Sequence, residues 1–312
     1  MPTISEKIRN RGIFRNDFDE FMPMVGHNMG MTYFAVSDIH GFLLPLKEAL
    51  ANAGFSKEDP NHFLIVLGDV FDRGEEPLEV YEFLSSMPED RLVLVKGNHE
   101  DAFIKMLRRG YPTPADFHNK TALTLCLLGA KDKEEAREWH EELADECNLC
   151  FTAPMMEKAA HQAKMESLFS SISHSGRVQD VASWLSSPVW KNYFETKGFV
   201  LAHAGIPRYS GFRHGDRRQW EEARWANPIF EYRHRYYDPV FNQGKKMVVG
   251  HFHTSAMFEE LDPHRLLPNQ PQPLEGCPWR MDCPIFDNGY LVGIDACTAL
   301  TGKVNVFSFL EP

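Results

Sequence analysis

The sequence predicts an α/β fold built on parallel strands. Short apolar segments that suit buried strands alternate with segments of helical periodicity, which is the order that βαβ units produce. Polar residues follow the first three strands at intervals of about 30 residues, the length of one βαβ unit. Hydrophobic residues make up 43% of the 312 residues, so the chain has enough apolar surface to fill a core.

The first third of the chain contains three strand–helix pairs. Each strand is a short apolar run that ends in a polar cluster, and each helix repeats apolar residues at a helical period. Gly54 marks the end of the first helix, because glycine commonly follows a helix C-terminus. We expect strands over residues 33–36, 63–67 and 92–95, and helices over residues 42–53, 77–84 and 100–109.

A change in composition predicts a helical cap, inserted between core strands over about residues 110–197. This stretch is rich in Glu, Lys, Ala, Met and Leu. Helical periodicity is clear over residues 133–147 and 155–169. Strands then resume, separated late in the chain by a proline-dense loop over residues 263–284. We expect these strands over residues 199–202 and 247–249 and near residues 290–294 and 303–309.

The domain organisation follows from these segments. Residues 1–30 show no steady period, and we expect an N-terminal extension that packs irregularly or as a short helix near residues 4–15. The alternating pattern begins at Met31. We therefore expect one domain over residues 31–312 that carries the helical cap, and not two independent domains.

The polar clusters at the strand ends contain side chains that bind metals. Asp38 and His40 are two residues apart, so in extended chain they point to the same side, and His251 and His253 repeat this arrangement. The clusters together offer two carboxylates, one amide oxygen and four imidazoles. This set is too large for one tetrahedral zinc ion and suits two divalent ions of the first transition row, with Asp69 bridging them.

Five motifs carry a resemblance to a known family. They are Asp38-Ile39-His40, Gly68-Asp69-Val70-Phe71-Asp72-Arg73-Gly74, Gly97-Asn98-His99-Glu100, the lone His203, and Gly250-His251-Phe252-His253. In this order they resemble the calcineurin-like metallophosphoesterase superfamily. The arginine of the second motif is typical of its phosphoprotein phosphatase-like branch, which is related to bacterial serine/threonine phosphatases and diadenosine tetraphosphatases. The resemblance implies a four-layer αββα sandwich with a helical cap.

The resemblance also implies a ligand set for two divalent ions, which would be manganese, iron or zinc. Asp69 would be shared by both ions. The first ion would also be held by Asp38, His40 and His253. The second ion would also be held by Asn98, His203 and His251. Many members of the phosphatase branch lack the second histidine of the last motif, so its presence here leans toward the wider phosphodiesterase families.

The expected reaction is hydrolysis of a phosphate monoester. Two dications acidify a water that bridges them, since one bound zinc ion already lowers the pKa of a water to about 7, and the resulting hydroxide attacks phosphorus in line. Arg73 can bind the phosphoryl oxygens bidentately. His99 is placed to protonate the leaving group, with Asp72 orienting it. Arg224 is a candidate for a second phosphate-binding arginine, with an ordinary surface arginine as the alternative.

Other functions stay open at this point. The substrate would be a phosphoprotein or a small phosphate ester, and the alternative is a nucleotide phosphoesterase such as a diadenosine tetraphosphatase or a phosphodiesterase. A non-catalytic binding module is a remote alternative, because no ligand of the motifs is missing. The segment 232–237 either stacks on a base or is a packed loop. Cys147 and Cys150 with Cys277 and Cys283 are either buried thiols or a zinc site.

Charge and composition limit the partners. The formal charge of −11 repels an extended nucleic acid, although it does not exclude a small anionic ester at a local site. No apolar run reaches the roughly 18 residues of a membrane helix, so we expect no membrane insertion. Six cysteines in this length are too few for a disulfide scaffold and indicate reduced thiols in a cytoplasm.

Overall fold

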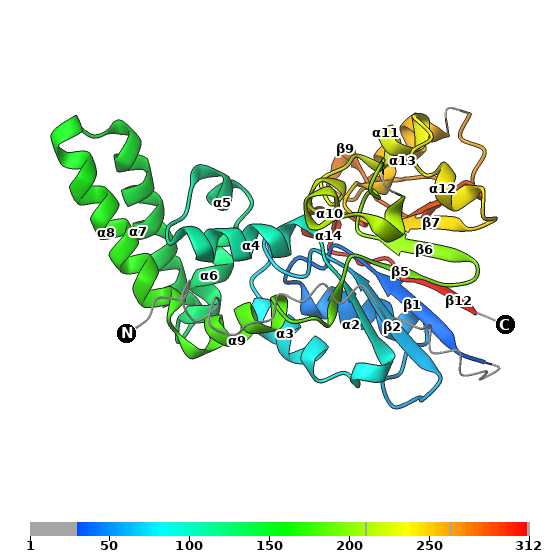
Figure 1. The fold of residues 1–312 in the computed structure, drawn as a ribbon, viewed down its shortest axis with the longest axis horizontal. Helices are drawn as coiled ribbons and strands as arrows, with labels where there is room; N and C mark the ends of the chain where they lie inside the picture. Colours follow the sequence, from blue (N-terminus) through cyan, green and yellow to red (C-terminus); the bar gives the residue numbers. More distant parts are fainter. Residues whose placement is uncertain (1–29, 210, 263, 311–312) are drawn as a thin grey trace.

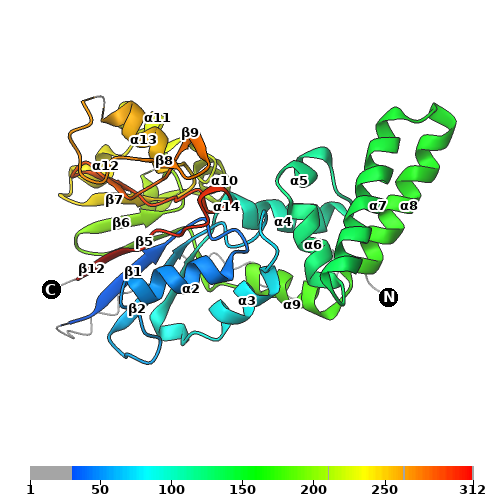
Figure 2. The same cartoon turned by 180° about the vertical axis from the view of Figure 1, so that it is seen from behind.

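Two five-stranded β-sheets stack face to face and carry helices on both outer faces (Figures 1 and 2). The structure, a computed structural model, describes residues 30–209, 211–262 and 264–310. The extension expected over residues 1–30, with its short helix, lies outside the described residues except for Gly30. Within the described part of the chain, no helix is both long and apolar enough to cross a membrane.

The first sheet has the strand order β12-β1-β2-β3-β4. Strands β1 to β4 run parallel to one another, and β12 is antiparallel to β1. The middle strands are almost entirely apolar, as parallel strands covered on both faces must be. The bounds are β1 Thr32–Val36, β2 His62–Leu67, β3 Leu92–Val95, β4 Trp190–Lys191 and β12 Phe307–Leu310.

The second sheet has the strand order β10-β11-β7-β6-β5. Strands β11, β7 and β6 are parallel, and antiparallel strands flank them at both edges. A separate two-stranded hairpin, β8 with β9, lies within the proline-dense segment. The bounds are β5 Tyr193–Glu195, β6 Phe199–Ala202, β7 Lys246–Val249, β8 Pro273–Leu274, β9 Cys277–Met281, β10 Phe286–Asp287 and β11 Leu291–Gly293.

Three apolar layers hold the sandwich together. Between the sheets, Ile65 and Val95 of the first sheet share a buried cluster with Leu201, Val248 and Val292 of the second. The alternate residues of the first sheet pack against α2, α3 and α4, and those of the second sheet pack against α10 to α13. The order helix, sheet, sheet, helix confirms the predicted αββα sandwich.

The helices of the sandwich differ between its two outer faces. Helices α2 and α3 cover the outer face of the first sheet, as Figure 2 shows most clearly, and α4 leads away toward the inserted helices. Their bounds are α2 Leu43–Asn52, α3 Pro77–Ser85 and α4 Asn98–Arg109. The helices that follow β6 are shorter, and their bounds are α10 Arg217–Ala223, α11 Pro228–Arg233, α12 Asp238–Phe241, α13 Thr254–Leu261 and α14 Thr298–Thr301.

Five helices between α4 and β4 form what we call the helical arm. Helices α7 and α8 pack against each other as a hairpin that projects from the sandwich (Figure 1). Helix α6 instead packs against α3 and α4 of the sandwich, and its Leu125 and Leu128 are fully buried. The bounds of the arm helices are α5 Pro114–His118, α6 Thr121–Gly129, α7 Lys133–Thr152, α8 Met155–Ser173 and α9 Gly176–Leu185.

The predicted elements correspond to observed ones, with differences at their ends. The helix expected from residue 100 begins at Asn98, because Gly97 is extended and the Glu100 carboxylate accepts its N–H. The segment expected to be a proline-dense loop also holds the hairpin β8–β9. The three short strands β4, β5 and β10 were not predicted, since two or three residues carry no periodic signal.

Two glycines with positive φ provide a matched test of how closely the strand ends pack. Gly68 follows β2, and a Cβ there would lie within 3.0 Å of the Gly97 backbone and the His203 ring. Gly54 follows α2 and has open space around it. Gly54→Ala should cost about 1 kcal/mol of unfolding free energy, the cost of left-handed backbone. Gly68→Ala should cost about 3 kcal/mol or more, because overpacking adds to this strain. Urea unfolding of the metal-free variants measures both, and equal losses would contradict the packing argument.

Candidate active site

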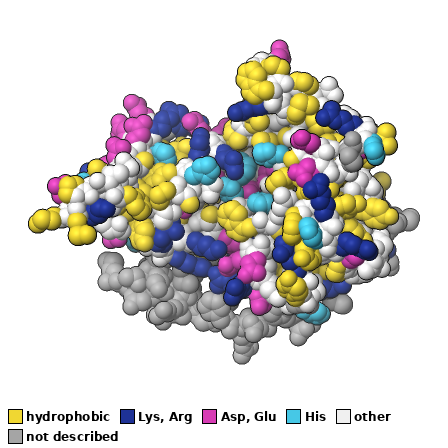
Figure 3. Space-filling model, turned by 90° about the horizontal axis from the view of Figure 1, so that it is seen from above, with side chains coloured by type: hydrophobic (Ala, Val, Ile, Leu, Met, Phe, Trp, Pro, Cys, Tyr) yellow, Lys and Arg dark blue, Asp and Glu magenta, His cyan; other side chains and the backbone are white. Residues whose placement is uncertain are grey.

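The carboxyl ends of five strands line one pocket, those of β1, β2 and β3 from the first sheet and those of β7 and β11 from the second. The end of β6 carries His203, which contacts Asp69 but is not part of the pocket lining. Histidine side chains gather there, near the middle of the face shown in Figure 3, between the helical arm and the sandwich. The pocket has a volume of about 120 Å³. Its lining consists of Asp38, His40, Asp69, Arg73, Asn98, His99, Asn119, Trp225, His251, His253, Asp295, Cys297, Thr298 and Ala299.

The loops that follow these strands adopt unusual backbone conformations. Six predicted site residues that are not glycine have positive φ, and they are Asp38, His40, Asp69, Asp72, Arg73 and His251. Such conformations cost free energy and persist only where the surroundings enforce them. Hydrogen bonds between loops do so here. The N–H of His40 donates to the carbonyl of Asp69 at 2.9 Å, and that of Gly250 donates to the carbonyl of His203 at 2.8 Å.

The buried carboxylate of Glu100 fastens two of the loops to each other. It accepts the backbone N–H of Asp69 at 3.0 Å, of Val70 at 2.9 Å and of Gly97 at 2.7 Å. Glu100 is part of the third motif, but no role was predicted for it. Its hydrogen bonds hold the loop after β2 against the loop after β3.

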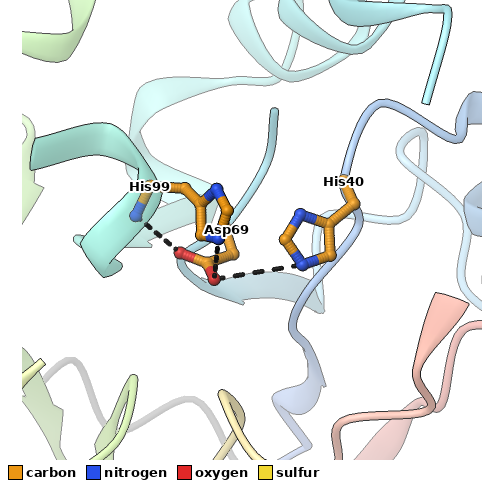
Figure 4. A group of neighbouring side chains, drawn as sticks. All are labelled: His40, Asp69 and His99. Atoms are coloured by element: carbon orange, nitrogen blue, oxygen red, sulfur yellow. Dashed lines mark hydrogen bonds and ion pairs between the residues drawn. The ribbon is translucent and has the colours of Figure 1, made fainter. Parts of the chain in front are cut away.

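Asp69 lies between two groups of imidazoles. Its Oδ2 is 4.0 Å from Nε2 of His40 and 3.8 Å from Nε2 of His99 (Figure 4). Its Oδ1 is 3.4 Å from Nε2 of His203. Asp69 therefore belongs to two clusters of potential metal ligands, one with His40 and His99 and one with His203 and His251. Within each cluster the ligand atoms lie within 4.8 Å of one another.

Backbone carbonyls fix which nitrogen of two histidines faces the pocket. The Nδ1 of His40 donates to the carbonyl of Phe71 at 2.9 Å, and that of His203 donates to the carbonyl of Leu67 at 2.7 Å. Each Nε2 is then left with a lone pair on the side of Asp69. An imidazole oriented by a second partner in this way is typical of metal-binding histidines. Near His203, Oδ1 of Asn98 lies 2.9 Å and Nδ1 of His251 lies 3.2 Å from its Nε2.

The electrostatics of the site favour a dication. Burial, with the charges of Asp295 and Asp69, raises the pKa of Asp38 well above its usual value, and burial raises the pKa of Asp69 to about 7. Burial lowers the pKa of His40 and of His203, so both imidazoles are neutral near pH 7. Clustered carboxylates with neutral imidazoles are the donor set that a divalent transition metal binds, so these residues fit the implied ions.

His99 and Asp72 form a buried pair beside Asp69. The Nδ1 of His99 lies 2.6 Å from Oδ2 of Asp72, which leaves Nε2 facing the pocket. Burial lowers the pKa of His99, but the charge of Asp69 and the hydrogen bond and charge of Asp72 outweigh it and raise the pKa to about 9 in the metal-free protein. The imidazolium is therefore the stable form at neutral pH.

The two predicted phosphate-binding arginines differ in position. Arg73 is exposed, lines the pocket and makes no ion pair with any described residue. Arg224 is buried and does not line the pocket. Its Nε lies 2.7 Å from Oδ2 of Asp101, and its Nη1 donates to Asn192 at 3.0 Å. Arg224 thus contacts Asp101 and Asn192 instead of lining the pocket, and its phosphate-binding role stays a prediction.

His253, the remaining predicted ligand, lines the pocket. Several other residues of the lining were not predicted as site residues, and one of them is the buried carboxylate of Asp295. Asn119 comes from the arm, and Trp225 follows α10 with 52% of its surface exposed. The sequence signal for Trp225 was its place directly after Arg224, whereas Asn119 lies in a segment without a recognisable motif.

The structure shows where the residues of two other hypotheses lie, the cysteine zinc site and the base-stacking segment 232–237. Among the described residues, no cysteine belongs to a cluster that could hold a metal, and all six cysteines are free thiols. This arrangement favours free thiols over a zinc site, although only Cys147 and Cys283 of the four are buried, while Cys150 and Cys277 are partly exposed. None of the residues 232–237 lines the pocket. Tyr237 is fully buried and donates to the carbonyl of Ala204, so it supports the loop that carries His203.

Curated relatives of the chain include symmetrical bis(5'-nucleosyl)-tetraphosphatases. The enzyme of Pseudomonas syringae pv. syringae is 31% identical over 109 residues, which cover 35% of this chain and 35% of the relative. That of Pseudomonas putida is 27% identical over 177 residues, which cover 57% of this chain and 43% of the relative. The chain therefore matches less than half the length of these relatives.

Solved structures with a similar chain path include two of low identity. A serine/threonine protein phosphatase from Saccharomyces cerevisiae is 12% identical, with a TM-score of 0.43, and the match covers 92% of this chain and 82% of that one. A metallophosphoesterase from Sphaerobacter thermophilus is 17% identical, with a TM-score of 0.40, and the match covers 86% of this chain and 77% of that one.

The sequence pattern of calcineurin-like phosphoesterases matches residues 31–255. This range is most of the chain and contains all five motifs at the strand ends. The match confirms the resemblance drawn from those motifs. The chain belongs to the calcineurin-like phosphoesterase family.

Proposed function

We propose that the chain is a two-metal phosphatase that hydrolyses phosphate monoesters in the manner of serine/threonine phosphoprotein phosphatases. The observation that carries this proposal is the position of Asp69. One of its oxygens faces His40 and the other faces His203, so a single carboxylate can serve two ions. The pocket is small enough to favour a phosphoryl group as the part of the substrate that enters it.

The proposed ligands divide around Asp69. Asp38, His40 and His253 would complete one ion site. Asn98, His203 and His251 would complete the other. When bound, two divalent ions lower the pKa of coordinated water and offset negative charge on the phosphoryl oxygens. Manganese, iron and zinc all suit this mixture of oxygen and nitrogen donors.

The remaining steps belong to side chains of the protein. Arg73 binds the phosphoryl oxygens from the exposed wall of the pocket, since no ion pair with a described residue competes for its guanidinium. His99 is held by Asp72 with its Nε2 toward the pocket. As the ester P–O bond breaks, the Nε2 proton passes to the leaving oxygen, which departs as an alcohol.

Metal binding and turnover should depend together on Asp69. Metal-free protein titrated with Mn²⁺ in a calorimeter should bind two ions and gain hydrolysis of an aryl phosphate, and a chelator should abolish that activity. Asp69→Asn should lose at least one ion and nearly all turnover, because both sites lose a charged ligand. Asp90→Asn, on the exposed surface, is the control and should bind two ions. Activity without metal, or near wild-type turnover of Asp69→Asn, would refute the two-metal proposal.

Substitution of His99 should lower kcat most for substrates that have a poor leaving group. His99→Ala should lower kcat for an alkyl phosphate by roughly 10²-fold or more, the usual contribution of a general acid, and much less for a nitrophenyl ester. The same variant should still bind two Mn²⁺ ions. Equal losses on both esters would remove the acid role, and loss of an ion would make His99 a metal ligand instead.

A nucleotide substrate is the second candidate, and the position of Trp225 favours it. This exposed indole lines the mouth of the pocket, with its ring centroid 6.3 Å from that of His251. An aromatic face at this place can stack on a base whose phosphates occupy the pocket. The names of the curated relatives, which are bis(5'-nucleosyl)-tetraphosphatases, point to the same class of substrate.

Substitution of Trp225 separates the two candidates. If the enzyme acts on dinucleoside polyphosphates, Trp225→Ala should raise KM for diadenosine tetraphosphate by about tenfold or more, because stacking on a base contributes roughly 1–3 kcal/mol. Hydrolysis of a phosphopeptide or an aryl phosphate should change little. Trp279→Ala is the control, since this exposed tryptophan lies on β9 away from the pocket lining. An unchanged KM for the dinucleotide would leave the phosphomonoesterase as the better proposal.

A further inference from the structure

The carboxylate of Asp72 is buried and receives hydrogen bonds from three side chains. Its Oδ2 accepts from Nδ1 of His99 at 2.6 Å and from the hydroxyl of Thr121 at 2.7 Å. Its Oδ1 accepts from the hydroxyl of Thr124 at 2.7 Å. No cation pairs with Asp72 among the described residues except His99, so the two hydroxyls are what fixes the plane of this carboxylate.

Thr124 holds the backbone of Asp72 as well as its side chain. The backbone N–H of Asp72 donates to the hydroxyl of Thr124 at 3.1 Å, while the same hydroxyl donates to the carboxylate. Asp72 has φ of 71°, a conformation that needs support from its surroundings. One hydroxyl therefore fixes both ends of the residue that orients His99.

Both threonines belong to α6, the first long helix of the arm to reach the core. They are three residues apart, so their hydroxyls lie on one face of the helix. Leu125 and Leu128 on the same helix are fully buried in the apolar cluster of the first sheet. Packing thus holds α6 rigidly, and the helix presents two hydroxyls to Asp72 from outside the five motifs.

We propose that Thr121 and Thr124 are positioning residues that hold the Asp72–His99 pair in the orientation for protonating the leaving group. This inference rests on the proposed function, in which His99 is the acid. It assigns the inserted helices a direct part in the chemistry of the site. Neither hydroxyl touches the pocket, so neither residue is expected to bind substrate or metal.

The experiment compares leaving groups rather than absolute rates. Thr124→Val removes both hydrogen bonds with little change in shape, Thr121→Val removes one, and Thr124→Ser retains the hydroxyl. Thr124→Val should lower kcat for an alkyl phosphate by about tenfold or more and that for a nitrophenyl ester by much less, with KM unchanged. Thr121→Val should show the same selectivity in a weaker form, and Thr124→Ser should restore the alkyl ester rate.

Two further variants separate positioning from folding. Leu128→Ala leaves both hydroxyls in place, so it should lower stability without selectivity between the esters. His99→Ala combined with Thr124→Val should be no slower on the alkyl ester than His99→Ala alone, since the threonine acts only through the imidazole. Additive losses, or equal losses on both esters from Thr124→Val and Thr121→Val, would overturn the inference while leaving the acid role of His99 intact. Absence of selectivity in His99→Ala itself would overturn both.

Discussion

Glu100 places a buried negative charge between two loops, and the geometry of the site depends on how that charge is satisfied. A buried carboxylate costs free energy unless donors surround it, and three backbone N–H groups do so here. Those N–H groups belong to the loops after β2 and β3, so movement of either loop would cost the carboxylate at least one donor. Asp69 is one of the donors, and this contact supports its left-handed backbone.

The sequence predicted the parallel core because that part of the chain depends on local patterns. Fully buried strands such as β3 are continuous apolar runs, and their periodicity needs no tertiary information. The pairing of strands into two stacked sheets is not a local property, so the prediction of a sandwich came from the family resemblance instead. The hairpin β8–β9 was missed for a physical reason, since its residues are mostly exposed and carry no buried alternation. The domain boundaries stay predictions.

The motif residues could be named from the sequence because each follows a parallel strand, and such ends converge at one edge of a sheet. Their roles stay predictions. Arg224 shows where this reasoning ends, since only the structure places Asp101 and Asn192 around its guanidinium. Asp295 also follows a parallel strand, β11, so the same argument could have found it. Thr121 and Thr124 do not follow a strand. Two threonines in an apolar helix can serve many purposes, so the sequence alone does not assign them to the site.

The helices of the arm are held in two different ways. Its hairpin of α7 and α8 projects from the sandwich, and Met155 and Met156 near its tip are almost fully exposed, so their loss leaves no cavity. Helix α6 is held by the apolar core on one side and by Asp72 on the other. Opening of α6 would expose apolar surface and also remove two donors from a buried carboxylate, and both effects oppose it. The same packing that stabilises the insertion thus keeps the Asp72–His99 pair oriented.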